Sequence, residues 1–208
     1  AELPGMYQAG EYDLAGFAVG VVERSAILDG SAVKGDETLI GIASDGLHSN
    51  GYSLARGALL ERAGLRLDSE PDGLGEPLVD ALLRPTRIYA RAAQAAVATG
   101  HVRAMSHITG GGLPGNLPRI LPAGVVARLD PSQWHRPAIF DLVQKHGEVK
   151  DSEMYRTFNM GLGMVLVVDP AGEAQVLDAL EASGERAQRI GTLQANPDDP
   201  EPARVDLA

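Results

Sequence analysis

The stretch ETLIGIASDGLHSNGYSLARGALLERA, residues 37–63, joins a buried-type apolar run to a helix-forming run through a short polar loop. Its first part, Glu37–Ala43, has the apolar, β-branched composition of a strand in the core of a sheet. Its last part, Tyr52–Ala63, is rich in residues that favour a helix, and Gly64 follows where a helix commonly ends. The sequence therefore predicts a strand, a loop and a helix in succession.

The loop between them, Ser44–Gly51, holds an acid, an imidazole, hydroxyls, an amide and glycines within eight residues. A polar, glycine-containing loop between a strand and a helix start presents backbone N–H groups and side chains to an anion. A second loop of this kind, Ser106–Gly112, follows a strand-like run at Val102–Met105. We expect the two loops to meet around one cavity that takes a phosphorylated small molecule.

The remaining elements can be placed from composition, periodicity and turn residues. Further strands are expected at Ala15–Glu23, Val102–Ile108, Gly124–Leu129, Gly161–Asp169, Arg186–Leu193 and Ala203–Leu207. Helices are expected at Pro85–Thr99, Pro114–Leu121, Ala138–His146 and Ala171–Ser183, and a surface loop at Leu65–Glu76. Strands and helices interleave without strict alternation. The sequence therefore predicts an α+β fold in which a mixed β-sheet packs against helices.

The helix expected at Pro85–Thr99 has one apolar face. Apolar residues recur there at the i, i+3, i+4 spacing of an amphipathic helix. We expect this face to point to the core, with Ile88, Tyr89, Ala92, Ala93, Ala96 and Val97.

Composition excludes several classes of function. The chain has 28 acidic and 18 basic residues and a formal net charge of −10. This diffuse negative charge argues against nucleic acid as a partner, because such surfaces carry a clustered basic patch. The chain contains 0 cysteines, which rules out disulfides and thiolate metal sites. No apolar run approaches the roughly 20 residues of a membrane span, and no signal peptide is visible, so we expect a cytoplasmic protein without a membrane partner.

In the first loop, Asp45 and His48 are the titratable pair. They are three residues apart and could converge on one ligand, with His48 as proton donor or phosphate contact. The alternative is a structural turn in which Ser49 or Asn50 caps the following helix.

In the second loop, Gly110, Gly111 and Gly112 let the backbone adopt conformations closed to other residues and expose consecutive amides. Thr109 precedes them and Asn116 follows, which strengthens the case for a binding loop. A packing constraint on the glycines is the alternative.

A third polar segment lies before the strand expected at Gly161–Asp169. Arg156, Thr157 and Asn159 occupy positions where a strand enters the core, which suits ligand contact. The alternative is a turn that closes its own backbone hydrogen bonds. No metal-binding pattern such as His-x-x-x-His is present.

Several segments together resemble one family, the phosphoribosylformylglycinamidine cyclo-ligases (aminoimidazole ribonucleotide synthetases). The resemblance runs nearly end to end and keeps its order along the chain. It is carried by Ala1–Tyr7, Ser44–Leu54, Leu83–Tyr89, His107–Gly112, Asn116–Arg119 and Glu153–Asn159. Met160 is a departure, since the family often has Cys at this position.

The resemblance implies a reaction and a set of roles. The reaction converts formylglycinamidine ribonucleotide and ATP to aminoimidazole ribonucleotide, ADP and phosphate, with Mg²⁺ as the metal. His48 would be the catalytic imidazole, and Asp45 and Glu2 would help to hold Mg²⁺. Substrate or phosphate contacts would come from Ser49, Asn50, Thr109, Gly110, Gly111, Gly112, Asn116, Arg156, Thr157 and Asn159.

The resemblance also implies an organisation. Residues 1–14 would end an interdomain segment, residues 15–195 would form the C-terminal, substrate-side domain, and residues 196–208 a tail with a short last strand. An N-terminal half, present in the family and absent from this chain, would carry the dimer-forming sheet and most ATP and Mg²⁺ contacts. The family's full-length proteins would be homodimers.

Two other readings remain open. One is a related ATP-using enzyme with the same two-domain plan, of the thiamine-monophosphate kinase, selenophosphate synthetase or hydrogenase-maturation type. The other is a non-catalytic module that binds a phosphorylated metabolite.

Overall fold

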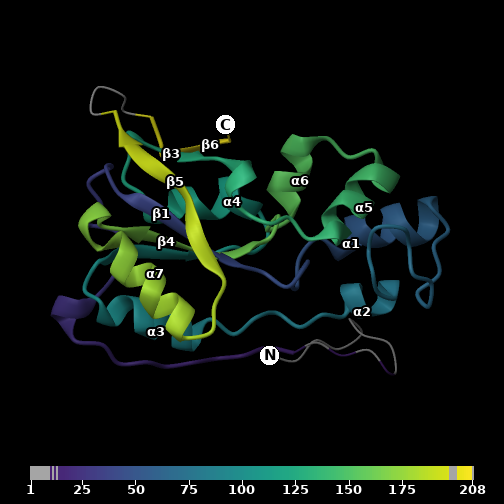
Figure 1. Cartoon of the computed structure of the whole chain (residues 1–208), viewed down its shortest axis with the longest axis horizontal. Coiled ribbons are helices and arrows are strands. Elements are labelled where there is room, and N and C mark those ends of the chain that lie inside the picture. Colours follow the sequence, from purple (N-terminus) through teal and green to yellow (C-terminus); the bar gives the residue numbers. More distant parts are fainter. Residues whose placement is uncertain (1–9, 11, 13, 197–200, 208) are drawn as a thin grey trace.

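The computed structural model describes residues 10, 12, 14–196 and 201–207. Its centre is a six-stranded sheet in the order β2-β4-β1-β5-β3-β6 (Figure 1). Neighbouring strands are antiparallel except β3 and β6, which are parallel. The strands are β1 (Thr38–Ala43), β2 (Val102–His107), β3 (Val125–Leu129), β4 (Leu162–Val168), β5 (Ala187–Ala195) and β6 (Arg204–Leu207). This mixed sheet with its helices confirms the predicted α+β class.

The helices divide between the two faces of the sheet and one side of it. The α-helices are α1 (Tyr52–Arg56), α2 (Leu78–Leu82), α3 (Ala90–Ala98), α4 (Gly112–Asn116), α5 (Ala138–Gly147), α6 (Asp151–Thr157) and α7 (Glu173–Ala182). Shorter turns are η1 (Arg24–Ala26), the π-helix η2 (Gly57–Arg62), η3 (Leu117–Ile120), η4 (Pro131–Gln133) and η5 (Pro170–Gly172).

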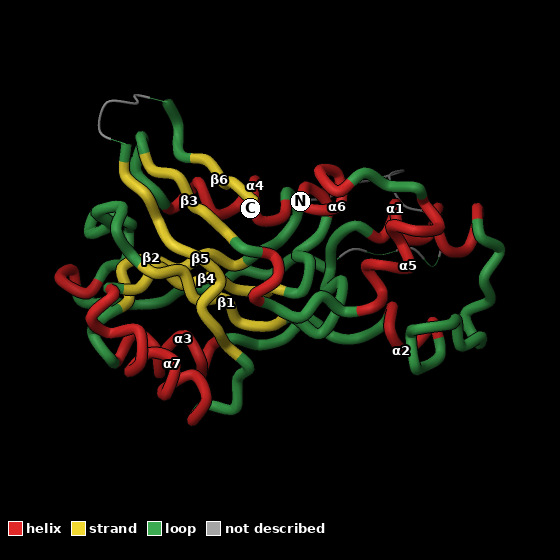
Figure 2. Tube along the Cα trace, turned by 45° about the horizontal axis from the view of Figure 1, so that its top comes forward, coloured by secondary structure: helices red, strands yellow, loops and turns green. Residues whose placement is uncertain are grey.

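Helices α3 and α7 cover one face of the sheet, and α4 with η3 lies on the other (Figure 2). The central strands β1 and β4 are buried on both faces, so their apolar residues alternate between the two layers. Ile40 contributes to the α3–α7 side and Leu39 to the α4 side. A sheet buried in this way fixes the register of every strand, because a slip by one residue would exchange the layers.

A second group of helices, α1, η2, α2, α5 and α6, packs beside the sheet around its own apolar cluster (Figure 1). Phe140 and Phe158, both fully buried, meet edge-on there with ring centroids 5.6 Å apart. This group includes the helix that follows the loop Ser44–Gly51 and α6, which leads toward β4. It therefore supports the candidate site from the side away from the sheet.

Most predicted strands are confirmed within a residue or two, including the last one, β6. The helix predicted over Tyr52–Ala63 is also present, as α1 continued by the π-helical turn η2. The helices predicted at Pro114–Leu121, Ala138–His146 and Ala171–Ser183 are confirmed as α4 with η3, α5 and α7.

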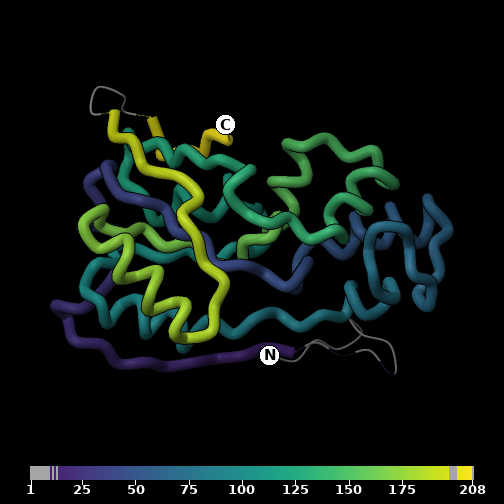
Figure 3. Tube along the Cα trace, viewed as in Figure 1, coloured from purple at the N-terminus to yellow at the C-terminus, as the bar shows by residue number. Residues whose placement is uncertain are grey.

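The strand predicted at Ala15–Glu23 is wrong for this structure. The segment is extended but belongs to no strand, and it runs along the lower border of the molecule in purple (Figure 3). Its side chains are exposed, Val21 completely so at 101%. The composition of the segment is that of a strand, yet the sheet described here ends at β2 and β6 without it.

The helix predicted at Pro85–Thr99 begins only at Ala90. Residues 84–89 are not helical because two of their side chains are held elsewhere: Arg87 by acidic residues and Tyr89 by the carbonyl of Ala43. The predicted core face is correct for Tyr89, Ala92 and Ala96, which are buried, and wrong for Ile88, which is 86% exposed, and Val97.

Two short helices, α2 and α6, were not predicted. Each spans only five or seven residues and has a proline or polar residue at its start, so periodicity gives little signal over that length. The predictions for Ala1–Tyr7, for Glu2 and for most of residues 1–14 concern residues outside the described part of the chain. No helix of the described part of the chain is long and apolar enough to cross a membrane.

The packing around Phe158 gives a first prediction. Phe158→Ala should lower the free energy of unfolding by about 3–5 kcal/mol, since a fully buried aromatic ring leaves a cavity. Ile88→Ala, at an apolar side chain that is 86% exposed, should change it by less than about 0.5 kcal/mol. Urea unfolding followed by circular dichroism measures both, and equal losses would contradict the assigned core.

Candidate functional site

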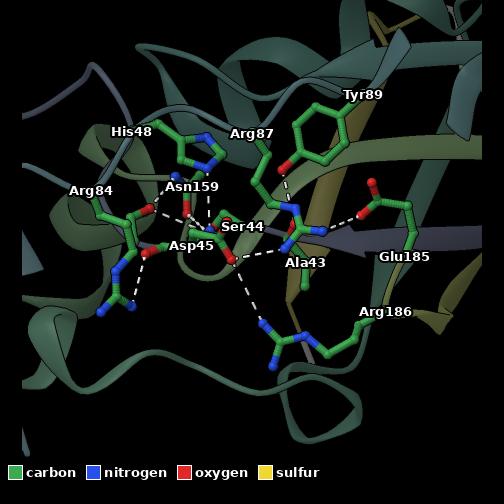
Figure 4. A network of polar contacts seen from close by, with 11 residues as sticks. Ala43, Ser44, Asp45, His48, Arg84, Arg87, Tyr89, Asn159, Glu185 and Arg186 are labelled. Carbon is green, nitrogen blue, oxygen red and sulfur yellow. Dashed lines mark hydrogen bonds and ion pairs between the residues drawn. The ribbon is translucent and has the colours of Figure 1, made fainter. Parts of the chain in front are cut away.

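Asn159 lies shortly before β4, which begins at Leu162. Its side chain holds the loop that follows β1 (Figure 4). Its Nδ2 group donates to the carbonyl of Gly46 at 2.8 Å. Its Oδ1 atom accepts from the Ser44 hydroxyl and from the Gly161 N–H, each at 2.8 Å. Asn159 and Ser44 are both 2% exposed. The sequence suggested Asn159 as a substrate contact, whereas in this geometry its polar atoms serve as a clamp on the loop.

His48 lies in the clamped loop with a left-handed backbone, φ 56°, and its side chain is 4% exposed. Its Nε2 atom accepts a hydrogen bond from the backbone N–H of Asp45 at 3.3 Å. Its Nδ1 atom is buried and has no hydrogen-bond partner among the described residues. Because Nε2 is an acceptor, the neutral ring carries its proton on Nδ1.

The surroundings keep His48 uncharged. Burial lowers the pKa of His48 below its ordinary value and is the largest cause. The Asp45 carboxylate acts in the opposite direction, while His107 and Arg87 lower the pKa further. The result is a neutral imidazole with one unsatisfied N–H donor, which is uncommon inside a protein.

Gly163, in β4, makes room for the His48 ring. A Cβ atom at this position would lie 1.9 Å from Tyr89 Oη and 2.9 Å from His48 Cε1. The Tyr89 hydroxyl donates to the carbonyl of Ala43 at 2.8 Å, and burial raises the pKa of Tyr89. Tyr89, whose ring centroid is 6.3 Å from that of His48, and Gly163 thus lie beside the imidazole.

The carboxylate of Asp45 points away from His48 and toward arginines (Figure 4). Arg87 bridges Asp45 at 2.8 Å and Glu185 at 2.6 Å, and Arg186 approaches Asp45 at 3.8 Å. The two predicted partners, Asp45 and His48, are therefore joined through the Asp45 backbone rather than through its carboxylate.

These ion pairs bear on the proposed metal. A carboxylate paired with guanidinium groups is a poor Mg²⁺ ligand, because their positive charge repels the cation and their N–H groups occupy the oxygen that would bind it. The described residues contain no group of three or more His, Cys, Asp or Glu side chains that could hold a metal ion. The other suggested ligand, Glu2, lies outside the described residues. The donor set found around Asp45 therefore does not fit Mg²⁺.

The side chain of Asn116 holds the glycine loop through hydrogen bonds. Its Nδ2 group donates to the carbonyls of Gly112 at 2.8 Å, Gly110 at 3.2 Å and Thr109 at 3.3 Å. Its Oδ1 atom accepts from the Thr109 hydroxyl at 3.2 Å. Asn116 is 4% exposed, so it shapes the loop from inside.

Gly110, Gly111 and Gly112 have different structural roles. Gly112 is buried, its N–H donates to the Thr109 carbonyl at 3.0 Å, and a Cβ there would lie 1.8 Å from the Tyr155 carbonyl oxygen. Gly111 has φ 98° and precedes α4, while Gly110 is exposed. Gly112 is therefore a packing residue whose own N–H is already paired.

The two loops meet, as predicted. Asn50 Oδ1 lies 3.4 Å from the Cβ position of Gly110. Gly51 in the first loop packs on the Phe158 ring, where a Cβ would be 2.2 Å from Cε1, and Gly112 in the second packs on the Phe158 carbonyl. The segment around Phe158 is thus the shared support of both loops.

Ser49 and Asn50, near the end of the first loop, differ in how exposed they are. Ser49 is exposed, and its hydroxyl lies 3.0 Å from that of Thr86. Asn50 is half-buried beside Gly110. The suggested helix cap is wrong: Gly51, with φ 79°, is the residue before α1, and no side chain caps this helix.

Arg156 and Thr157 lie at the end of α6 and both contact Glu153. The Arg156 guanidinium donates to the Glu153 carboxylate at 2.9 Å and 3.0 Å. The Thr157 hydroxyl donates to the same carboxylate at 3.2 Å. Arg156 is exposed and keeps donors free for an anion, since a guanidinium has five N–H groups.

A cleft of about 210 Å³ opens beside Ser44 and Asp45, with Arg84, Arg186 and His135 among its walls. A neighbouring cleft of about 360 Å³ shares Asp45, Arg84 and His135 with it. The glycines at 110–112 line neither cleft. The loops therefore touch, but the predicted shared cavity is not found in these two clefts, which include residues of the first loop and none of the second.

Sequence reasoning gave no site role to Arg84, Arg87, Tyr89 or Arg186. The first three lie in the segment Leu83–Tyr89, for which the sequence suggested a family resemblance and, from Pro85 onward, a helix with Tyr89 on its core face. Their clustering around Asp45 depends on the extended course of that segment. Arg186 begins the approach to β5 and had no recognisable signal in its local sequence.

Solved structures share this fold at low sequence identity. A thiamine-monophosphate kinase from Stenotrophomonas maltophilia matches with a TM-score of 0.55 and 18% identity over 89% of this chain and 54% of that chain. A hydrogenase maturation protein matches at 0.53 and 14%, over 86% of this chain and 52% of that chain. Phosphoribosylformylglycinamidine synthase II from Thermotoga maritima matches at 0.52 and 12%, over 90% and 26%. Identities this low show likeness of fold alone.

Curated relatives are much closer in sequence. The phosphoribosylformylglycinamidine cyclo-ligase of Myxococcus xanthus is 55% identical over 195 residues, 94% of this chain and 56% of the relative. That of Anaeromyxobacter dehalogenans is 59% identical over 196 residues, again 94% and 56%. The chain thus spans little more than half the length of these relatives. The model of one protein family matches residues 34–199, so the chain belongs to the family described as AIR synthase related protein, C-terminal domain.

Proposed function

We propose that this chain is the C-terminal part of an ATP-dependent cyclo-ligase that converts formylglycinamidine ribonucleotide to aminoimidazole ribonucleotide in purine biosynthesis. Curated relatives that are 55% and 59% identical over 94% of the chain bear the cyclo-ligase name. The observation that carries the proposal in the structure is the neutral, buried His48 with its unsatisfied Nδ1–H beside two glycine-containing loops.

The reaction makes modest chemical demands on the protein. The formyl amide oxygen of the substrate takes the terminal phosphoryl group of ATP, and ADP leaves. A nearby nitrogen of the substrate then attacks the activated carbon, phosphate departs with the oxygen, and the imidazole ring closes. Both steps depend chiefly on positioning and on stabilising charge that develops on oxygen.

His48 suits the requirement to stabilise charge that develops on oxygen. A neutral imidazole with its proton on Nδ1 is a hydrogen-bond donor to oxygen that gains negative charge. Its Nε2 atom is already engaged by the Asp45 N–H, which fixes the tautomer. We assign His48 as the catalytic imidazole that stabilises charge on the reacting oxygen; because its Nδ1 atom is buried in this structure, the loop Ser44–Gly51 must open for this contact to form.

The other suggested contacts fall into two groups. Gly110 and Gly111 offer amides for an anionic group of the substrate, while Thr109, Gly112 and Asn116 shape that loop. In this proposal Ser49, Asn50, Arg156 and Thr157 would contact substrate directly. Asn159 acts through the loop that carries His48 and is a positioning residue.

The nucleotide and metal belong mainly to the remainder of the complete protein in this proposal. The surroundings of Asp45 do not favour Mg²⁺, so Mg²⁺ and most ATP contacts would come from the part of the relatives that this chain does not match. The complete protein would be a cytoplasmic homodimer, on the family resemblance. The kinase-type alternative has only a likeness of fold in its support.

The first test is reconstitution. The 208-residue chain alone should show negligible ring closure with formylglycinamidine ribonucleotide, ATP and Mg²⁺. A chimera in which residues 14–208 replace the matching part of the Myxococcus xanthus cyclo-ligase should restore it. Formation of aminoimidazole ribonucleotide is the readout. Turnover of thiamine monophosphate by the chimera, or efficient ATP hydrolysis by the chain alone, would contradict the proposal.

The second test concerns His48. In the chimera, His48→Ala should lower kcat about 10²–10⁴-fold, the usual contribution of a positioned acid or base. His146→Ala, at a histidine in the last turn of α5, is the matched control and should leave kcat within about twofold. Unchanged activity in His48→Ala would favour the non-catalytic binding module.

The third test uses pH. The pKa of His48 is lower in the folded chain than in the unfolded chain, where it is about 6.5. The unfolded state then binds more protons below about pH 6.5, so this contribution to stability is complete above that pH and is lost as the pH falls. Between pH 7.5 and 5.5 the chain should lose more unfolding free energy than His48→Gln does. Urea titrations at both pH values measure this, and equal losses would refute the buried neutral imidazole.

A further inference from the structure

Arg87 joins three separate parts of the chain beside the loop Ser44–Gly51 (Figure 4). It lies in the extended segment before α3, and one of its guanidinium nitrogens donates to the Asp45 carboxylate at 2.8 Å. Another donates at 2.6 Å to the carboxylate of Glu185, in the connection between α7 and β5. The side chain of Arg87 is 20% exposed and that of Glu185 11%. The bridge is therefore largely shielded from water, and salt screens such a pair much less than an exposed one.

The extended course of residues 84–89 places Arg87 on the side of the loop. Side chains of an extended segment alternate between two sides. Arg87 and Tyr89 turn inward, whereas Ile88 between them is 86% exposed. Arg87 reaches Asp45, and the Tyr89 hydroxyl donates to the carbonyl of Ala43 at 2.8 Å. Both inward side chains therefore hold the chain where it leaves β1.

Asp45 passes this constraint to His48 through its backbone. The Asp45 N–H donates to Nε2 of His48 at 3.3 Å, slightly longer than an ordinary hydrogen bond. A bond this long is weak, so it depends on other contacts that keep the Asp45 backbone in place. Two arginines face the Asp45 carboxylate in Figure 4: Arg87 at 2.8 Å, and Arg186 at 3.8 Å with a side chain that is 70% exposed. Arg87 is thus the closer and better shielded of the two.

The bridge bears on which nitrogen of His48 carries the proton. While Nε2 accepts from the Asp45 N–H, the proton of the neutral ring lies on Nδ1. Without that bond the proton can lie on either nitrogen. The charge of Arg87 acts in the same sense. Burial lowers the pKa of His48 most, the Asp45 carboxylate raises it, and His107 and Arg87 lower it further.

We propose that Arg87 is a positioning residue for His48: paired with Asp45 and Glu185, it holds the Asp45 N–H against Nε2 and keeps the imidazole proton on Nδ1. In this role Arg87 acts through Asp45 and makes no contact with substrate. Its importance for activity rests on the proposed function, in which Nδ1–H is the donor to the reacting oxygen. Its effect on the imidazole is a property of the chain without substrate.

Nuclear magnetic resonance of the imidazole nitrogens tests this effect in the isotope-labelled, ligand-free 208-residue chain. Long-range proton–nitrogen correlations distinguish a proton on Nδ1 from one on Nε2, and the signals of His48 are those missing from His48→Gln. The unchanged chain should show the Nδ1–H form. In Arg87→Gln a clear fraction of the Nε2–H form should appear, and the pKa of His48 should rise toward about 6.5 because a positive charge is lost. A purely Nδ1–H ring in the folded Arg87→Gln chain would overturn the proposal.

Arg103→Gln is the matched control. Arg103, near the start of β2, pairs with Asp169 at 2.5 Å, and its side chain is 27% exposed. The substitution therefore removes an arginine–aspartate pair of similar burial from another part of the sheet. It should leave both the protonated nitrogen and the pKa of His48 unchanged. A shift as large as that of Arg87→Gln would indicate general loosening of the fold and would count against positioning.

Asp45→Ala decides the question if Arg87→Gln does not fold. It keeps the backbone N–H of residue 45 but removes the carboxylate that Arg87 holds. The Nε2–H form should appear here too. Where all variants fold, the double variant should show no more of it than the larger single effect, because both residues act in one path. A pure Nδ1–H ring in Asp45→Ala, or additive effects in the double variant, would contradict the proposed path.

Kinetics in the Myxococcus xanthus chimera separate positioning from substrate binding. Arg87→Gln should lower kcat about 10²-fold, the cost of a misplaced catalytic group, and leave KM for formylglycinamidine ribonucleotide within about twofold. A rise in KM with unchanged kcat would make Arg87 a substrate contact and overturn the proposal. The resonance experiment contains no substrate. If His48→Ala kept full activity, the proposed function would fail, and the shift of the imidazole proton would still test the role of Arg87.

Discussion

The hydrogen bonds of the Asn159 amide are the constraint on which the site depends. Its Nδ2 group donates to the carbonyl of Gly46, and its Oδ1 atom accepts from the Ser44 hydroxyl and the Gly161 N–H. The group is buried, so each bond removed would leave a polar atom without water, at a cost of about 1–3 kcal/mol. The amide therefore locks the exit of β1 to the entry of β4, and the left-handed conformation of His48 is imposed by that locked loop.

The same short segment also brings the two loops together. Phe158, next to Asn159, supports Gly51 through its ring and Gly112 through its carbonyl. Neither glycine could carry a side chain without displacing this support. Asn159 and Phe158 thus act as a pair: one fixes the conformation of the first loop, and the other fixes its distance from the second. A site assembled from distant parts of the chain needs such a shared support to be reproducible.

Much of the fold could be predicted because the central strands and the longer helices carry strong patterns. The nearly continuous apolar run of β4 and the polar loop after β1 were recognisable from composition alone. The failures have physical causes. The segment 14–22 has the composition of a strand but belongs to no sheet among the described residues. The segment before α3 stays extended because Arg87 and Tyr89 have tertiary partners. For the site, sequence found both loops but could not show that the amides of Asn116 and Asn159 face inward to the protein. It also could not find the arginines around Asp45, since their meeting is purely tertiary.

The strand order β2-β4-β1-β5-β3-β6 has a consequence for how the chain reaches its native state, because no two neighbours in the sheet are consecutive along the chain. Thr38 in β1 pairs with Val168 on one side and Thr192 on the other. Each strand pairing closes a long loop, and the entropy of that closure is lost before the contacts of the pair contribute stabilising free energy. Such a topology is associated with slow folding. During synthesis β1 leaves the ribosome long before either partner exists. The apolar strand at the centre of the sheet therefore stays unpaired, and open to aggregation, until β4 and β5 have been synthesised.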